Sequence, residues 1–143
     1  MKAMSLAFLR VAIGLILVLW GLIKIANPQA GIHVSDKYYL GILSPGALQL
    51  PLGVVELIIG ILVVLGLFRR FVLPAQAFVL VLGAAAIWRY LLDPLALFLL
   101  DAQDRQVLFF PSLGVAAASL VLLAFQAEDR FALDALRKSP DRG

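Results

Sequence analysis

The chain has 143 residues, of which 63% are hydrophobic and only 15% are charged. Soluble domains are typically about 45–50% apolar and about 25% charged, so this composition excludes an ordinary water-soluble domain and also intrinsic disorder. The net charge is +3, but the 12 Lys and Arg residues lie at the ends of apolar runs rather than together, so we predict no nucleic-acid partner. These features predict a small integral membrane protein that contacts membrane lipid.

Four apolar segments are long enough to cross a bilayer as helices, which takes about 20 residues. They cover residues 6–26, 48–68, 71–92 and 107–125. Backbone groups in a bilayer must be paired within the segment, and the runs are continuous rather than alternating, so helices are expected and strands are not. The second and third segments meet at Arg69 and Arg70, a connection so short that these helices must be antiparallel. The sequence predicts an all-α fold: a transmembrane up-down-up-down four-helix bundle over residues 1–125.

The basic residues near the segment ends predict the orientation. If the N-terminus lies inside, most of them fall on the inner side, while Lys24, Lys37, Arg89 and Arg105 fall on the outer side. The positive-inside rule then places both termini in the cytoplasm, in the plasma (inner) membrane of a prokaryote. Residues 126–143 alternate charges with apolar side chains and are predicted to form a separate amphipathic cytoplasmic tail.

Polar and small residues share one face in two of the segments, at steps of three or four residues. Glycine lets membrane helices approach closely, whereas a charge facing lipid costs at least about 2.5–3.5 kcal/mol. We therefore expect the faces with polar and small residues to pack together and the charged side chains to point into the bundle. The two faces consist of Arg10, Gly14, Leu17, Gly21 and Lys24, and of Gln49, Gly53, Glu56, Gly60 and Val63. Arg89 is expected to point inward as well, and Gly114 with Ala118 is a predicted packing pair in the fourth segment.

Glu56 is the sharpest single feature, because it lies about three residues, or about 4–5 Å, outward of the centre of its segment. An isolated carboxylate there would be protonated, since burial disfavours the charged form. Lys24 and Arg89 lie near the outer ends of other segments and can reach it, whereas Arg10 belongs to the inner half. Two interpretations stay open: a polar contact that sets helix register, or a functional proton or ligand site.

The two outer loops hold the remaining candidates. His33 is the only histidine, and Ser35 is expected to cap a short interfacial helix that carries Tyr38 and Tyr39. We interpret all three side chains, His33, Tyr38 and Tyr39, as interfacial, with proton transfer as the alternative for the histidine. The second loop contains an apolar hexad, residues 95–100, which is too short to span and is expected to lie on the membrane as a lid or re-entrant turn.

The absence of cysteine and the presence of only one histidine limit the cofactors that the chain can bind. With no cysteine the chain forms no disulfide and no Cys-bound iron–sulfur centre, and one histidine cannot supply both axial ligands of a bis-His haem. Asp101 and Asp104 have a spacing that could bind a cation, but no further ligand accompanies them, so a solvated acidic rim is the preferred interpretation. We predict no haem, no iron–sulfur centre and no metal.

Three stretches resemble the DoxX family of small four-helix membrane proteins. They are FLRVAIGLILVLWGLIKIANP (residues 8–28), LPLGVVELIIGILVVLGLFRR (residues 50–70) and the shorter EDRFALDAL (residues 128–136). The second stretch is the most specific match, because a glutamate in the middle of the segment is followed by a G-L-x-x-R motif at its end. The positions that match the family pattern are Arg10, Gly21, Lys24, Glu56, Gly60, Gly66 and Arg70.

The resemblance implies a quinone-associated subunit of a membrane redox complex, similar to the membrane subunits of thiosulfate:quinone oxidoreductase. Quinone is then the implied cofactor, other redox subunits are the implied partners, and Glu56, Lys24, Arg89 and Arg10 are the candidates for the headgroup or for proton transfer. The family supplies no catalytic residue that can be carried over. The alternative is a non-catalytic assembly or lipid-binding protein that docks a larger complex. A small-solute transporter is less favoured, because four helices without inverted repeats are few for alternating access unless the chain forms a homo-oligomer.

Overall fold

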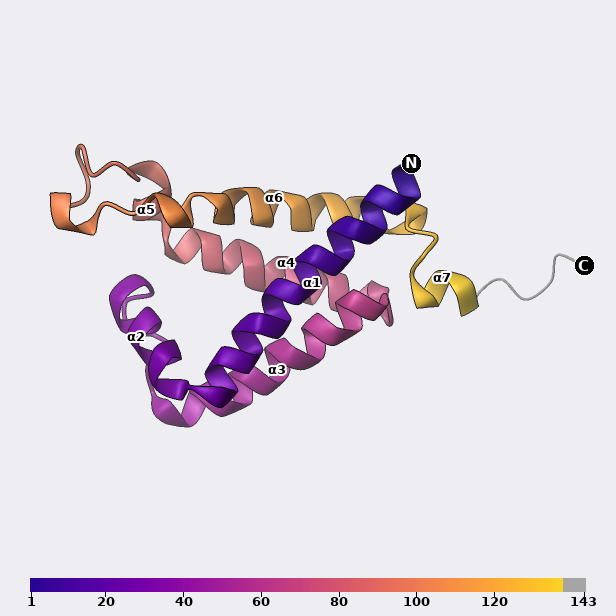
Figure 1. The fold of residues 1–143 in the computed structure, drawn as a ribbon, viewed down its shortest axis with the longest axis horizontal. Coiled ribbons are helices and arrows are strands. Elements are labelled where there is room, and N and C mark those ends of the chain that lie inside the picture. Colours follow the sequence, from indigo (N-terminus) through magenta and orange to yellow (C-terminus); the bar gives the residue numbers. More distant parts are fainter. Residues whose placement is uncertain (138–143) are drawn as a thin grey trace, which may run out of the picture.

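The structure is a computed structural model that describes residues 1–137. Within these residues the regular structure is entirely helical and no strand occurs, which confirms the predicted all-α fold. The long helices are α1 (Lys2–Ala26), α3 (Gly46–Leu65), α4 (Arg69–Ala86) and α6 (Pro111–Ala124), shown in Figure 1. The shorter elements are α2 (Pro28–Tyr38), α5 (Trp88–Leu92), α7 (Leu133–Arg137) and the 3-10 turns η1 (Ala102–Asp104), η2 (Val107–Phe109) and η3 (Gln126–Glu128).

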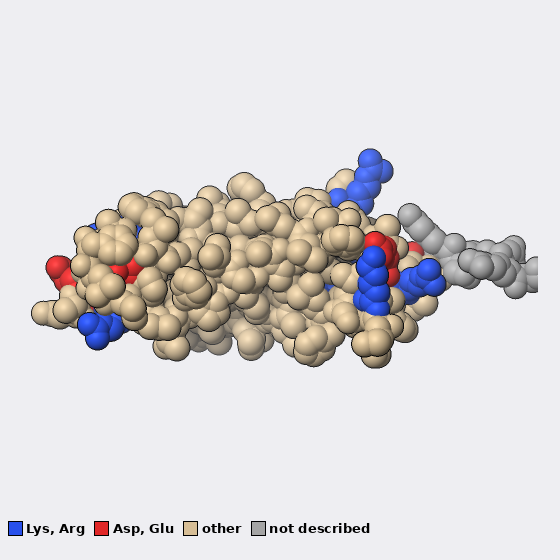
Figure 2. Space-filling view, turned by 90° about the horizontal axis from the view of Figure 1, so that it is seen from above, with Lys and Arg blue, Asp and Glu red and all other residues tan. Residues whose placement is uncertain are grey.

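Four helical stretches are long and apolar enough to cross a membrane, as predicted. They are Lys2–Ala26, Gly46–Leu65, Arg69–Ala86 and Val107–Ala124, and the last consists of η2 and α6. Charged side chains gather at the two ends of the molecule, and the face between them is almost entirely uncharged (Figure 2). We call the end with α2 and residues 93–109 the loop end, and the end with Lys2, Arg69 and residues 126–137 the tail end.

Helices α1 and α3 form the tightest contact, and glycines make it. A Cβ atom on Gly14 would lie 3.0 Å from the carbonyl oxygen of Gly60, and one on Gly21 would lie 2.7 Å from that of Gly53. Because the lower number on α1 faces the higher number on α3, the two helices are antiparallel. All five residues of the predicted α1 face are buried, as are Gln49, Gly53, Gly60 and Val63 on α3. The backbones therefore touch along the face on which the charged residues lie.

The expectation for Gly114 was wrong. A Cβ atom on Gly114 would have no neighbour within 4 Å, and the residue is exposed on the outer face of α6. Buried positions on α6 are Ala116, Ser119 and Leu122 instead. Small residues occur on both sides of this helix, so the pair Gly114 and Ala118 did not identify the side that packs.

Two predicted boundaries at the loop end also change. The third segment does not continue to residue 92, because α4 ends at Ala86 and a turn at Ile87 leads into α5. Helix α2 begins at Pro28 with Asn27 as its cap, whose side chain accepts a hydrogen bond from the Ala30 N–H at 3.3 Å. Ser35 is therefore not a cap. It lies buried inside α2, where its hydroxyl accepts a hydrogen bond from the Leu43 N–H at 3.0 Å.

The described part of the tail is not a separate element. Asp129 is 1% exposed and Ala132 is fully buried, because residues 126–137 fold back over the ends of α1, α3 and α4. A Cβ atom on Gly66 would lie 2.6 Å from that of Ala132, and the left-handed φ of 71° at Gly66 ends α3 beneath the tail. The folded unit therefore extends beyond residue 125 to at least residue 137. Residues 138–143 of the predicted tail lie outside the described residues.

Candidate functional site

Lys24 and Glu56 form an ion pair between α1 and α3. The Nζ atom of Lys24 lies 2.6 Å from Oε2 of Glu56, and the two side chains are 11% and 15% exposed. Helical side chains tilt toward the N-terminus of their own helix, so in an antiparallel pair they tilt toward one another. Glu56 lies midway along α3 rather than outward of its centre, because the helix begins at Gly46 and ends at Leu65. A cation near the end of one helix thus reaches an acid at the middle of the other.

Other polar and aromatic groups surround this pair. The Lys24 ammonium lies 5.6 Å from the centre of the Trp20 ring, within cation–π range. Gln49 is 1% exposed, and its Nε2 donates to the carbonyl oxygen of Leu43 while its Oε1 has no partner. Burial, and then the negative charge of Glu56, raises the pKa of the Tyr39 hydroxyl above its ordinary value. The Glu56 carboxylate thus contributes to the environment of the Tyr39 hydroxyl.

Arg10 occupies a second polar site, at the tail end of the same helix contact. Its Nε donates to Oδ2 of Asp129 at 2.6 Å, and the two side chains are 4% and 1% exposed. Its Nη1 donates to the carbonyl oxygens of Val63, at 3.0 Å, and of Val64. These carbonyls belong to the last turn of α3, where the Val63 carbonyl also accepts from the Gly66 N–H at 3.0 Å, and the C-terminal end of a helix favours a cation. Arg10 therefore holds α1, the end of α3 and the tail together.

Sequence reasoning missed Asp129, which it placed in an amphipathic tail outside the bundle. The available signal was a buried arginine at a packing face, which needs an acid, together with the acids of the EDR phrase at residues 128–130. Arg69 also holds the tail in place. Its Nη1 donates to the carbonyl oxygen of Asp129 at 3.0 Å, and its backbone N–H donates to the carboxylate of Asp134 at 2.8 Å. Arg70, which matches the family pattern, is exposed.

Arg89 does not point into the bundle, so that expectation was wrong. It is exposed on α5 and donates from Nη2 to the carbonyl oxygen of Leu99 at 3.0 Å. The physical reason is the turn at Ile87, which ends the regular helix before Arg89 and sets it on a new helical direction. Arg89 is thereby removed from the Lys24–Glu56 pair.

The other loop candidates lie apart from the pair. Tyr38 packs edge-on against Phe109 and Tyr90, with ring centres 4.5 Å and 5.3 Å away, and so links α2 to α5 and η2. His33 is exposed and lines a shallow polar groove of about 480 Å³ along α2 with Asn27, Gln29 and Asp36. Among residues 1–137 no group of three or more His, Asp or Glu side chains is arranged to hold a metal ion.

Asp93 is a second acid that sequence reasoning did not single out. Its carboxylate is 1% exposed and accepts hydrogen bonds from the N–H groups of Leu97, Phe98, Leu99 and Leu100 at 2.7–3.1 Å. Removal from water raises the pKa of Asp93, but these four donors outweigh that effect and lower it from 3.8 to about 2. Asp93 therefore stays ionised at neutral pH and organises the loop that follows it.

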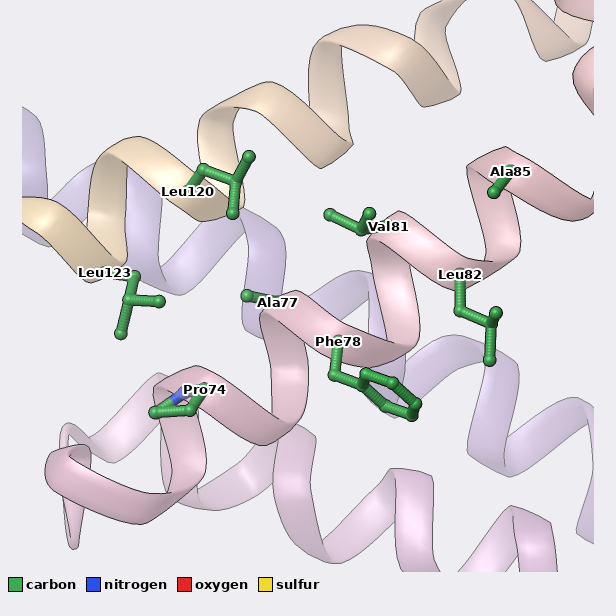
Figure 3. A pocket seen from close by; sticks show the side chains of 8 residues that line it. All are labelled: Pro74, Ala77, Phe78, Val81, Leu82, Ala85, Leu120 and Leu123. Atoms are coloured by element: carbon green, nitrogen blue, oxygen red, sulfur yellow. The ribbon is translucent and has the colours of Figure 1, made fainter.

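An apolar groove of about 390 Å³ runs between α4 and α6 on the outer surface (Figure 3). Its walls are formed by Pro74, Ala77, Phe78 and Val81 of α4 and by Leu120 and Leu123 of α6. Lys24 and Glu56 line neither this groove nor the polar groove along α2. The apolar groove can accept a hydrocarbon chain, but it offers no polar side chain to a headgroup.

The model of the DoxX family matches residues 5–90, which include most of α1 and all of α3 and α4. No curated protein and no solved structure matches the chain. The matched region holds Arg10, Lys24 and Glu56, whereas Asp93 and Asp129 lie outside it. Since the match spans more than half of the chain and the fold has four apolar helices long enough to cross a membrane, this integral membrane protein belongs to the DoxX family.

Proposed function

We propose that this chain is a quinone-associated subunit of a membrane redox complex and that the Lys24–Glu56 pair binds the quinone headgroup. The observation that carries the proposal is the pair itself, an ammonium and a carboxylate 2.6 Å apart at mid-helix depth that are 11% and 15% exposed. An ionisable pair at this depth is expensive to maintain in a membrane and is typical of functional sites. In the same proposal the protein lies in a prokaryotic plasma membrane with both termini in the cytoplasm.

The chemistry of the pair suits both oxidation states of the ligand. The Lys24 ammonium can donate a hydrogen bond to a quinone carbonyl oxygen, and the Glu56 carboxylate can accept one from a quinol hydroxyl. Oxidation of a quinol releases two protons and two electrons. Glu56 can take one of these protons, and the other can pass to water, since the two side chains of the pair are 11% and 15% exposed. The two electrons would pass to a redox centre on a partner subunit, since this chain has no cysteine for thiol chemistry.

Quinone extraction from the purified protein tests the proposal. The protein is isolated from membranes in a mild detergent, and bound quinone per mole of protein is measured by mass spectrometry. We expect near-stoichiometric quinone for the natural chain and a several-fold loss for Glu56→Gln and for Lys24→Met. Matched controls are Glu128→Gln and Lys37→Met, which change the same residue types on the exposed surface.

Two results would contradict the proposal. One is natural protein without quinone even when it is reconstituted with excess quinone. The other is equal quinone retention by the two site variants and their controls, with all variants folded by circular dichroism.

A second candidate, a non-catalytic assembly or lipid-binding protein, is favoured by the groove between α4 and α6. It faces outward, it is lined only by apolar side chains, and Phe78 at its edge is 68% exposed. In this role the Lys24–Glu56 pair only sets the register of two helices. Native mass spectrometry decides between the two: lipid or a partner chain that is lost on Ala77→Trp but kept on Glu56→Gln supports the assembly role.

A further inference from the structure

The loop that joins α5 to α6 is built around one carboxylate. Asp93 accepts from the Leu97 N–H with Oδ1 at 2.7 Å. Its Oδ2 accepts from the N–H groups of Phe98, Leu99 and Leu100 at 2.9, 2.7 and 3.1 Å. Four consecutive backbone donors thus turn inward onto one side chain, which leaves them unavailable to water.

Three further hydrogen bonds tie this loop together. The Gln106 N–H donates to the carbonyl oxygen of Pro94 at 3.2 Å, and Nε of Arg105 donates to that of Leu95 at 3.2 Å. Arg89 donates to the carbonyl oxygen of Leu99 at 3.0 Å. The loop therefore has a defined shape although it contains no regular helix between α5 and η1.

Whereas the backbone N–H groups of this loop turn inward, its large apolar side chains are exposed. Leu95, Leu97 and Phe98 are 50%, 73% and 70% exposed. Two more large apolar side chains are exposed near residues 93–100: Leu92 at 62% and Leu108 at 83%. In Figure 1 this segment lies at the loop end, beyond the end of α4 and beside the start of α6.

We infer that residues 93–100 form a preorganised anchor that inserts Leu97 and Phe98 into the interfacial region of the lipid bilayer. Non-helical backbone is tolerated at membrane depth only where its N–H and C=O groups are satisfied inside the protein. The Asp93 carboxylate satisfies four N–H groups that would otherwise need water as their partner. Inward backbone donors combined with outward large apolar side chains fit lipid.

Lipid is favoured over a protein partner by continuity and by charge. The exposed apolar side chains of the loop are followed by Leu108, which lies in the stretch Val107–Ala124 that is long and apolar enough to span a membrane, and are preceded by Leu92 of α5. Arg89 and Arg105 are both exposed beside the loop, and each uses only part of its guanidinium in the bonds given above. Their free N–H groups suit lipid phosphates, and long basic side chains commonly extend to that depth.

Site-directed spin labelling tests the anchor directly, since the chain has no natural cysteine. Leu97→Cys and Phe98→Cys are labelled with a nitroxide in full-length protein reconstituted into phosphatidylcholine–phosphatidylglycerol vesicles. Accessibility to oxygen, which concentrates in lipid, is compared with accessibility to a water-soluble nickel chelate. Phe78→Cys, on the exposed face of α4, is the lipid reference, and Gln103→Cys, on the polar side of the same loop, is the water reference.

We expect the oxygen-to-nickel ratio at residues 97 and 98 to exceed that at residue 103 several-fold and to approach that at residue 78. A ratio like that of residue 103 would overturn the proposal, because the side chains would then lie in water. Low accessibility to both reagents would also overturn it, in favour of a contact with another protein copy.

The role of Asp93 is tested by adding Asp93→Ala to the two labelled variants. Loss of four hydrogen bonds should release the loop, so the labels should become more mobile and their oxygen-to-nickel ratio should fall toward the water reference. Unchanged mobility and unchanged ratio would show that the carboxylate does not organise the anchor. The measurements with Asp93 intact decide the lipid insertion even if the double variants fail to fold.

Discussion

Two ion pairs lie on the one face where α1 meets α3, and they differ in how completely they are enclosed. Arg10 and Asp129 at the tail end are 4% and 1% exposed, and Arg10 also donates to carbonyls at the end of α3. Lys24 and Glu56 are 11% and 15% exposed, and the Lys24 ammonium has one carboxylate partner and one aromatic neighbour. Both cations come from one face of one helix.

The difference shows that the same sequence pattern produces ion pairs with different degrees of enclosure. Small and polar residues at helical spacing bring both cations into the helix contact. At the tail end, residues 126–137 cover Arg10, whose hydrogen bonds connect α1 to the end of α3 and to the tail. This pair therefore has a structural role. At the loop end the cover is less complete, since the side chains of Lys24 and Glu56 keep 11% and 15% of their surface exposed. The enclosure, not the helix face, separates a structural pair from a candidate site.

The largest effect is expected from breaking the enclosed pair. Asp129→Ala leaves the Arg10 guanidinium buried without its acid, and loss of one partner of a buried pair typically costs about 3–5 kcal/mol. We expect a large fall in the unfolding temperature of the protein in lipid nanodiscs, measured by intrinsic fluorescence. Asp101→Ala, the same change at an exposed position, is the control and should stay within about 0.5 kcal/mol. Equal unfolding temperatures for the two variants would show that the Arg10–Asp129 pair does not stabilise the fold.

Next in size is a change in the contact that both pairs share. Gly21→Ala places a Cβ atom 2.7 Å from backbone atoms of α3, so the helices must separate, at a cost of about 1–3 kcal/mol. Gly83→Ala, where a Cβ atom meets nothing within 4 Å, is the control and should be neutral or slightly stabilising. Thermal unfolding of both variants in nanodiscs measures the difference. A loss of stability at residue 83 as large as at residue 21 would contradict the close approach of α1 and α3.

A smaller effect is expected at the more open pair. Glu56→Gln keeps a hydrogen-bond acceptor for Lys24, whose flexible side chain is not fully enclosed, so we expect a loss of about 1 kcal/mol. Asp129→Asn makes the matching change at the enclosed pair and should lower the unfolding temperature several times as much. If Glu56→Gln proved the more damaging of the two, the proposed contrast between the pairs would be reversed.

The smallest effect concerns pH and the loop at residues 93–100. The pKa of Asp93 is about 2 in the folded protein against an ordinary 3.8, so the folded state binds fewer protons in this interval. Its stabilising contribution is therefore complete above about pH 4 and is lost as the pH falls from there toward 2. Exchange of the amide hydrogens of residues 97–100 should accelerate relative to those of α6 on acidification through this range. Asp93→Asn should abolish that acid-dependent step, and protection that is independent of pH would contradict the assignment.

The membrane class and the inward side of α1 and α3 could be predicted from the sequence, because both depend on local periodicity. Four glycines recur at helical spacing with the charged residues of these helices: Gly14, Gly21, Gly53 and Gly60. Residues at this spacing share a face of the helix whatever surrounds it. Where a helix carried small residues on more than one side, as α6 does around Gly114, periodicity alone selected the wrong side. The turn at Ile87 left no mark in the hydropathy pattern, so Arg89 was expected to continue along α4.

The amino-acid sequence by itself determined that the chain has four apolar helices and that Arg10, Lys24 and Glu56 lie on faces suited to packing. Only the tertiary structure decided which charges meet, because the two residues of the Arg10–Asp129 pair are 119 positions apart and no periodic pattern links them. It likewise decided that Asp93 gathers four amides from the following loop. The physical reason is that hydropathy and helical spacing act over a few residues, whereas a counterion is set by how distant parts of the chain fold back on one another.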